Sequence, residues 1–207
     1  MPVITVDSGV DPDTSLAYIA TDNLGAAKLG AEKLAELIGG KGKVGDIGIT
    51  AGSQIGYERE DGFLQGMKAF PDVEVLPVQY SGCSSAKSLN IATDIYTSNP
   101  DIVGFYGACD GSGTGAGQPA KQKGLDLRIV AFDSSAEELE LFKEGHIDAL
   151  ILQDPFKMGY DGVYALDKVV NGQKVEPRTV LIPAQVVTKE NMNEPAIQKL
   201  LNDMELL

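Results

Sequence analysis

The chain has 207 residues, of which 43% are hydrophobic, and its formal net charge at pH 7 is −13. This length allows one substantial domain with a hydrophobic core, or one and a half. The acidic balance argues against nucleic acid and anionic membrane surfaces as direct partners, because both attract basic patches. No stretch approaches the about 20 apolar residues of a membrane span, and the opening residues do not have the pattern of a secretory leader.

Strands and helices alternate along the sequence. Residues 1–7 form an apolar run that ends in an acid and predict a buried strand. Further strands are predicted over 44–49, 73–78, 102–107, 128–133, 147–152 and 178–187. Helices are predicted over about 24–38, 53–70, 86–96, 135–144 and 156–171, with a weak last helix over 194–207. This order predicts an α/β fold, a doubly wound parallel sheet with helices on both faces.

Local signals set several helix ends. Asp22 is a candidate N-cap, and Gly39-Gly40 is expected to end the helix that follows it. The segment 111–123 should be helical by its position, but it contains four glycines and Pro119. Each interior Gly costs about 1 kcal/mol relative to Ala and an interior Pro about 3 kcal/mol. We therefore expect a short, kinked or late-starting helix there.

Polar residues and one cysteine follow the ends of predicted strands. Parallel sheets of this kind bind ligands at the carboxyl ends of their strands. The residues at these ends are Asp7, Ser53, Cys109, Asp133 and Gln153. Their common position predicts a binding site along one edge of the sheet.

Simpler interpretations exist for some of these residues. Asp133 could cap the helix that begins near Ser135, and Asp110 is expected to cap the segment after it. Cys83 and Cys109 are too few for a disulfide scaffold. If both line one cleft they could form a redox or nucleophilic pair, but we favour two small buried hydrophobic residues.

The sequence Ile129-Val-Ala-Phe-Asp133, followed after a helix by Gln153-Asp-Pro155 and another helix, resembles the sugar-binding proteins of bacterial uptake systems, in the ribose-binding group. The sensor domains of lac-repressor-family regulators share that fold. The resemblance runs from Met1 to about Asn191. It implies a periplasmic-binding-protein-like type I lobe with leftover elements of a second lobe.

The resemblance also implies a division of the chain. Residues 1–7 and 156–183 would be remnants of the first lobe, 20–153 with 184–191 the second lobe, and 192–207 a tail helix. Three crossings between the lobes would lie near 8–20, 153–155 and 183–185. About three βα units of roughly 30 residues each would complete the first lobe upstream.

The family pattern assigns roles to single residues. Asp7 and Asp133 match carboxylates that grip sugar hydroxyls, and Gln153 matches an amide that both donates and accepts hydrogen bonds. Four further pocket positions depart from the pattern. Ser8 and Tyr57 stand where the family has arginines, Cys109 where it has an asparagine, and Cys83 where it has an aromatic residue. Arg59 matches another arginine of the same turn, with a structural role. These departures indicate either a ligand other than ribose or a pocket whose residues have changed from the family pattern.

The resemblance predicts the solute-binding component of a sugar ABC transporter. It would bind a monosaccharide or related polyol in a cleft between lobes, and a membrane permease or a chemoreceptor would be its partner. Its location would be periplasmic or otherwise extracytoplasmic. The alternative is the effector-binding domain of a lac-repressor-family regulator. The Gly-Lys-rich step between Leu37 and Val44 favours the transport class. Because most of the first lobe would be absent from this chain, sugar affinity should be weak and the chain should self-associate.

We do not expect an enzyme. The sequence offers no nucleophile–base–acid set, and His146, the only histidine, is placed at the amino end of a strand. The glycines of 111–117 lack the spacing of a dinucleotide loop. No cofactor and no metal are therefore predicted.

Overall fold

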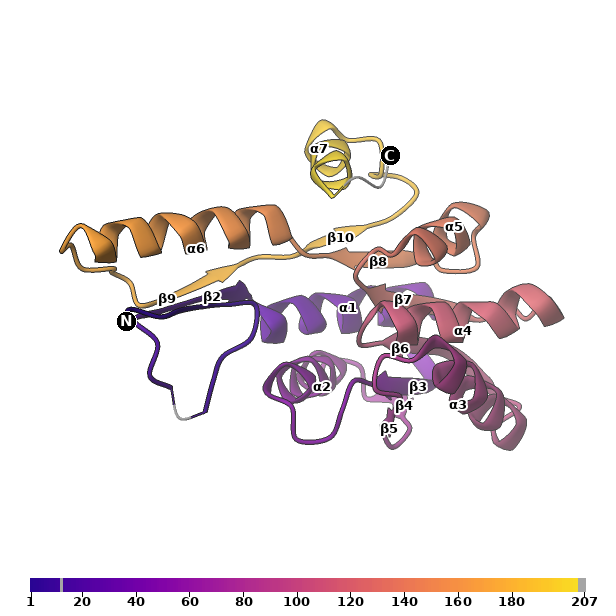
Figure 1. The fold of residues 1–207 in the computed structure, drawn as a ribbon. Helices are drawn as coiled ribbons and strands as arrows, with labels where there is room; N and C mark the ends of the chain where they lie inside the picture. The colour runs from indigo at the N-terminus through magenta and orange to yellow at the C-terminus, as the bar shows by residue number, and fades with distance from the viewer. Residues whose placement is uncertain (12, 205–207) are drawn as a thin grey trace.

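Two sheets of unequal size organise residues 1–11 and 13–204, which are described in this computed structural model (Figure 1). The smaller sheet has three strands and the larger has seven. In Figure 1 the smaller sheet lies with a long helix on one side of the molecule, and the larger sheet and the other helices lie on the other side. We call these the small unit and the large unit.

The small unit combines segments from both ends of the chain. Its strands β1 (Ile4–Val6), β2 (Ala17–Thr21) and β9 (Thr179–Ile182) are parallel and adjacent in that order. Helix α6 (Pro155–Val170) packs on one face of this sheet, and their shared core contains Ile19, Met158, Ala165 and Ile182. The region 8–20, expected as a crossing, therefore includes most of a strand of the small unit. The apolar and β-branched residues of β2 pair with β1 and β9, which the sequence pattern did not indicate.

The large sheet has the strand order β10-β8-β7-β6-β3-β4, with β5 pairing to β3 beyond the end of β4. Every pairing is parallel except that of β10 with β8. Its strands are β3 (Lys41–Gly48), β4 (Asp72–Val75), β5 (Gln79–Tyr80), β6 (Ile102–Gly107), β7 (Arg128–Phe132), β8 (Ala149–Leu152) and β10 (Gln185–Val187).

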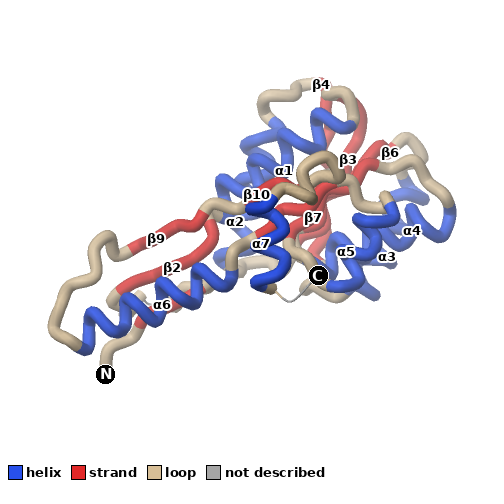
Figure 2. Tube along the Cα trace, turned by 90° about the horizontal axis from the view of Figure 1, so that it is seen from above, coloured by secondary structure: helices blue, strands red, loops and turns tan. Residues whose placement is uncertain are grey.

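Helices cover both faces of the large sheet (Figure 2). One face carries α1 (Asn23–Leu37) and α2 (Gln54–Met67), and the other carries α3 (Ser85–Ser98), α4 (Asp110–Lys123), α5 (Ala136–Glu144) and α7 (Pro195–Asp203). Successive residues of a strand point to opposite faces, so Phe105 joins one core and Tyr106 the other. The predicted doubly wound α/β fold is confirmed.

The chain passes between the units at three places. It leaves β2 for α1 at Thr21-Asp22, leaves β8 for α6 at 153–154, and leaves β9 for β10 at Pro183-Ala184. The single strand predicted over 178–187 is thus two strands in two sheets. Proline cannot donate to a strand ladder, which accounts for the break at Pro183.

Helix α4 corrects the expectation for residues 111–123. It begins at Asp110 and continues for 14 residues, with Pro119 inside it. A Cβ at Gly111 would overlap the carbonyl of Cys83, and a Cβ at Gly115 would overlap Ser88. The glycines lower intrinsic helix propensity, but they let α4 approach its neighbours closely, and this packing stabilises the full helix.

Helix caps agree better with the sequence. Asp22 caps α1 by accepting a hydrogen bond from the Gly25 amide at 3.0 Å, and Gly39 and Gly40 follow the helix with positive φ. Ser135, not Asp133, caps α5. Cys109, not Asp110, is the N-cap position of α4, and Asp110 is the first residue of the helix. The tail helix ends at Asp203, and the predicted residues 205–207 lie outside the described residues.

Candidate ligand-binding site

Asp133 and Gln153 meet at the carboxyl edge of the large sheet. Asp133 follows β7 and Gln153 follows β8, and these strands are neighbours. The Gln153 amide nitrogen donates to Asp133 Oδ1 at 2.5 Å. The hydroxyl of Thr21, at the end of β2, donates to the Gln153 amide oxygen at 2.6 Å. Gln153 therefore connects the last residue of a strand in the small unit to a carboxylate in the large unit.

Arg59 supports this arrangement from helix α2. Its side chain is buried, its Nε donates to Asn23 Oδ1 at 2.9 Å, and its Nη1 donates to the Ala108 carbonyl at 2.8 Å. The same Nη1 lies 3.7 Å from Asp133 Oδ2. The guanidinium also stacks on Phe132, with 3.9 Å from its central carbon to the ring centroid. These contacts hold Arg59 rigidly and are consistent with its expected structural role.

Asp133 is under opposing electrostatic influences. Burial raises the pKa of its carboxyl group, while the positive charge of Arg59 and the hydrogen bond from Gln153 act to lower it. The Asp110 backbone N–H also donates to Asp133 Oδ2, at 3.3 Å. A quarter of the Asp133 side chain stays exposed (26%), so the carboxylate can still accept hydrogen bonds from a ligand.

A cavity of about 770 Å³ lies beside these residues, between the two units. This is within the usual range for small-molecule sites. Its lining combines carboxylates and hydroxyls with an apolar wall and consists of Val6, Asp7, Asp110, Asp133, Ser134, Ser135, Gln153, Pro155, Phe156, Met158, Gly159, Asp203 and Met204. The site thus joins strand ends of both sheets with the start of α6 and the end of α7.

Three residues proposed from the sequence line this cavity together: Asp7, Asp133 and Gln153. Asp7 follows β1 with a positive φ of 65°, and its carbonyl accepts a hydrogen bond from the Tyr18 hydroxyl at 3.2 Å. Residues 7 and 153 are far apart in the sequence, and only the pairing of β1 with β2 and the crossing after β8 bring them to one place.

Ser8 and Tyr57 are two of the four predicted site residues that lie outside this cavity lining. Ser8 is exposed and donates a hydrogen bond to Asp7 Oδ2 at 3.3 Å, so it contacts the site only through Asp7. Tyr57 is 70% exposed and lines two other surface hollows, one of them with Ser53 and Gln54. Neither side chain lines the 770 Å³ cavity.

Cys83 and Cys109 form a disulfide bond, with 6.0 Å between their Cα atoms. The interpretation as two separate buried hydrophobic residues is therefore wrong. The loop before α3 and the loop before α4 meet at the same sheet edge, and this brings together residues 26 positions apart. Neither cysteine lines the cavity.

Most lining residues were not proposed as site residues from the sequence, and Phe156 and Asp110 are the two that bear most on the site's chemistry. Phe156 lies on the wall of the cavity and is 59% exposed, although an exposed phenylalanine is unusual. The sequence could have indicated Phe156 through its position three residues after Gln153 and directly after Pro155. Asp110 was expected only as a helix cap, but it lines the cavity.

Comparison with known proteins decides the family. The model of the periplasmic binding protein domain matches residues 1–174. The chain belongs to this periplasmic binding protein family. The ribose import binding protein of Haemophilus influenzae is 30% identical over 178 residues, which are 86% of this chain and 61% of that protein.

Solved structures of the family agree closely with this fold. A solute-binding protein from Agrobacterium radiobacter in complex with D-arabinose has a TM-score of 0.92 at 35% identity, over 98% of this chain and 71% of that one. One from Agrobacterium vitis bound with α-D-tagatopyranose has a TM-score of 0.91 at 32% identity, over 97% and 71%. The chain spans about three fifths of the length of the ribose import binding proteins that it matches.

These relatives are binding proteins of transport systems, not enzymes, and they do not favour the regulator alternative. Tyr57, Cys83 and Cys109, where we expected departures from the family pattern, lie outside the cavity lining. Within the described ranges 1–11 and 13–204, no helix is long and apolar enough to cross a membrane, and no cluster of His, Cys, Asp and Glu could hold a metal ion.

Proposed function

We propose that this chain is the sugar-binding part of an ABC import system and binds a monosaccharide or related polyol between its two units. The observation that carries the proposal is the cavity lined jointly by Asp7, Asp133 and Gln153, from strand ends of both sheets. Carboxylates accept hydrogen bonds from sugar hydroxyls, and Phe156 offers an apolar ring face for the carbon skeleton. The same three residues are the proposed ligand contacts.

The division into lobes belongs to this proposal. We assign β1, β2, α6 and β9 to one lobe and the large unit to the other, with the segment after β10 as a tail. The two sheets are joined by three short crossings, which supports a hinge. Closure about such crossings is driven by contacts that a ligand makes only in the closed state.

The charge of the cavity narrows the ligand class. Among the described residues, its lining carries four carboxylates, those of Asp7, Asp110, Asp133 and Asp203, and no basic residue. An anionic sugar would be repelled there, because like charges at short range in a partly buried site are unfavourable. The proposed ligand is therefore an uncharged sugar or polyol.

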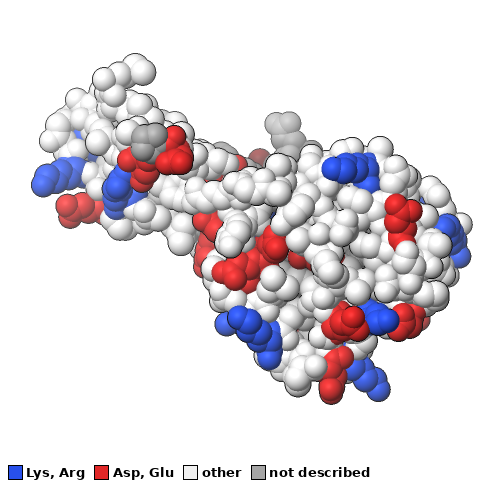
Figure 3. All heavy atoms as spheres, turned by 90° about the horizontal axis from the view of Figure 1, so that it is seen from below, with Lys and Arg blue, Asp and Glu red and all other residues white. Residues whose placement is uncertain are grey.

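The partners and compartment follow from the same function. A membrane permease, or a chemoreceptor, would receive the loaded protein. A disulfide persists in oxidising compartments such as the periplasm, and this supports an extracytoplasmic location. Acidic and basic side chains are interspersed on the face shown in Figure 3, without a basic patch, which disfavours a nucleic acid partner.

The test is a titration of the purified chain, followed by amide chemical shifts, with D-ribose, D-allose, D-arabinose and D-tagatose. These sugars are named for relatives or solved structures of the family. D-glucuronate serves as the anionic control. We expect saturable shifts at Asp133 and Gln153 with at least one neutral sugar and none with glucuronate. The absence of saturable shifts with every neutral sugar at millimolar concentrations would overturn the proposal.

A further inference from the structure

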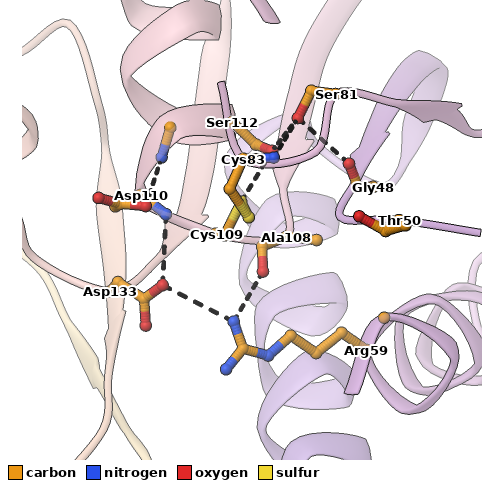
Figure 4. The surroundings of a disulfide bond; sticks show 12 residues. Gly48, Thr50, Arg59, Ser81, Cys83, Ala108, Cys109, Asp110, Ser112 and Asp133 are labelled. Atoms are coloured by element: carbon orange, nitrogen blue, oxygen red, sulfur yellow. Dashed lines mark hydrogen bonds and ion pairs between the residues drawn. A yellow bond between two sulfur atoms is a disulfide. The ribbon is translucent and has the colours of Figure 1, made fainter. Parts of the chain in front are cut away.

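The disulfide lies one residue away from the cavity. Cys83 belongs to the loop between β5 and α3, and Cys109 stands directly before α4 (Figure 4). Asp110, the next residue, lines the cavity and donates its backbone N–H to Asp133 Oδ2 at 3.3 Å. The covalent link is thus separated from a proposed ligand contact by one residue and one hydrogen bond.

A chain of polar contacts surrounds the disulfide. The Ser81 hydroxyl donates to the Gly48 carbonyl at 3.3 Å and accepts from the Cys83 amide at 3.2 Å. The hydroxyls of Ser81 and Ser112 are 3.2 Å apart, and the Ser112 hydroxyl lies 3.2 Å from Cys109 Sγ. Both serines are buried. The network joins the end of β3, the loop of Cys83 and the first turn of α4.

Backbone packing shows how closely this loop lies on α4. A Cβ at Gly111 would overlap the Cys83 carbonyl, so only glycine fits at this position of the first turn. Cys83 has a positive φ of 56°, which a non-glycine residue adopts at a cost. The loop is therefore held in a conformation that it would not prefer alone, and the disulfide is the covalent restraint that fixes it against α4.

We propose that the Cys83–Cys109 disulfide is a positioning element of the ligand site. It fixes the first turn of α4, and through the Asp110 N–H it fixes the orientation of the Asp133 carboxylate. Without the bond, the Asp110 N–H donates to Asp133 for less of the time, and the carboxylate loses one of the donors that aim its free lone pairs at the cavity. The importance of this orientation for sugar rests on the proposed function.

The first experiment needs no ligand. The double variant Cys83→Ser, Cys109→Ser is compared with the wild-type chain by amide hydrogen exchange and by ¹³C titration of the Asp133 carboxyl group. We expect exchange about tenfold faster at the amides of Asp110, Ser112 and Gly113, with little change at Ile129 and Leu150 in the sheet. The Asp133 titration should shift to higher pH. Unchanged exchange in the first turn together with an unchanged Asp133 titration would overturn the proposal.

The second experiment measures binding of D-arabinose and D-tagatose to the same proteins. The double variant should bind about tenfold more weakly, a change of about 1.4 kcal/mol. Ala35→Gly is the control, since it weakens helix α1 at a buried position away from the cavity. The control should keep wild-type affinity. Equal affinity of the double variant and the wild type would overturn the role in binding.

If neither sugar binds the wild-type chain, the proposed function fails for these sugars, and exchange and titration still decide the positioning role. If the double variant does not fold, the folded wild-type protein is reduced with a phosphine, its thiols are counted, and the exchange measurement is repeated. Faster exchange confined to the first turn of α4 would support the proposal. A reduced protein with the exchange pattern of the oxidised one would contradict it.

Discussion

Asp133 is the proposed ligand contact whose contribution can be tested most directly. It accepts hydrogen bonds from Gln153 and the Asp110 amide, lies 3.7 Å from Arg59 and remains partly exposed to the cavity. Replacing it by Asn keeps the size and removes the charge. A hydrogen bond to a charged group contributes about 1.5–3 kcal/mol, so we expect sugar affinity to fall about 10- to 100-fold.

The affinity of Asp133→Asn should be measured by chemical-shift titration beside Asp72→Asn, an exposed carboxylate on β4 at the far side of the large sheet. Both variants lose one negative charge, and only the first loses a cavity acceptor. Equal affinities in the two variants would show that Asp133 does not contact the ligand.

Asp46 is a second acid with an unusual environment, in the core of the large unit. It is 1% exposed, and neither of its oxygens has a hydrogen-bond partner among the described residues. Burial, with a smaller contribution from the negative charge of Glu60, raises the pKa of Asp46 to about 8. A folded-state pKa above the unfolded value means that the folded protein holds a proton that the unfolded chain releases.

Stability should therefore fall as the pH rises from about 4 to about 8, because the contribution of protonated Asp46 is lost over this interval. For one titrating group, the free energy of unfolding can change by at most about 1.4 kcal/mol per pH unit. Urea unfolding at several pH values measures this slope. Asp46→Asn should flatten it in part, since burial also raises the pKa of Glu138. A slope unchanged by Asp46→Asn would mean that Asp46 is ionised in the folded protein.

At the scale of elements, helix α4 is held by close packing that depends on its glycines. Gly115→Ala would raise helix propensity, but the new Cβ would overlap Ser88 of α3. We expect it to destabilise the chain by about 1–3 kcal/mol, the usual cost of overpacking. Gly159→Ala in α6 is the matched control, because no atom of the described residues lies within 4 Å of its Cβ position. It should stabilise by about 0.5–1 kcal/mol, and thermal unfolding of both variants would test the opposite signs.

The disulfide should also contribute to global stability. It closes a loop between residues 26 positions apart, for which the chain-entropy model predicts about 3–4 kcal/mol. Denaturant unfolding with and without a reductant measures this difference. If the denaturant midpoint of unfolding does not change on reduction, breaking the disulfide gives the unfolded chain little additional conformational freedom. The disulfide would then position α4 without stabilising the fold.

Elements defined by local signals could be predicted from the sequence. Asp22 caps α1 because the capping bond is local, and Asp133 and Gln153 directly follow strands that are mostly apolar. Other features depend on distant contacts. The full length of α4 requires its neighbours, and the bond between Cys83 and Cys109 requires two loops to meet. Their sequences carry no local trace of these contacts, and helix propensity indicated the opposite for α4.

At the scale of the molecule, Gln153 couples the two units. It follows the last strand before the crossing to α6, accepts from Thr21 at the end of β2 and donates to Asp133 of the large unit. A movement of one unit relative to the other would break or lengthen at least one of these bonds. If Gln153 contacts the ligand as proposed, ligand binding would directly affect the angle between the units.

The small unit presents apolar surface that the rest of the described chain leaves exposed. Helix α6 covers one face of its parallel sheet, and Leu181 of β9 is 52% exposed. The outer side of α6 adds Tyr160, Val163 and Val170, each more than 60% exposed. Parallel sheets are normally covered on both faces, and apolar patches of this kind mark contact surfaces. We propose that the chain, purified alone, associates with a second copy through the small unit.

Sedimentation equilibrium over a range of concentrations tests this association. The wild-type chain should form dimers whose fraction rises with concentration, and the double variant Val163→Lys, Leu181→Lys should be more monomeric. Leu64→Lys, an exposed leucine of α2 in the large unit, is the control and should behave as wild type. A lysine in a dimer contact would be desolvated at a high cost, whereas on a free surface it stays hydrated. A wild-type chain that is monomeric at every concentration would mean that the exposed apolar surface is not a contact between copies.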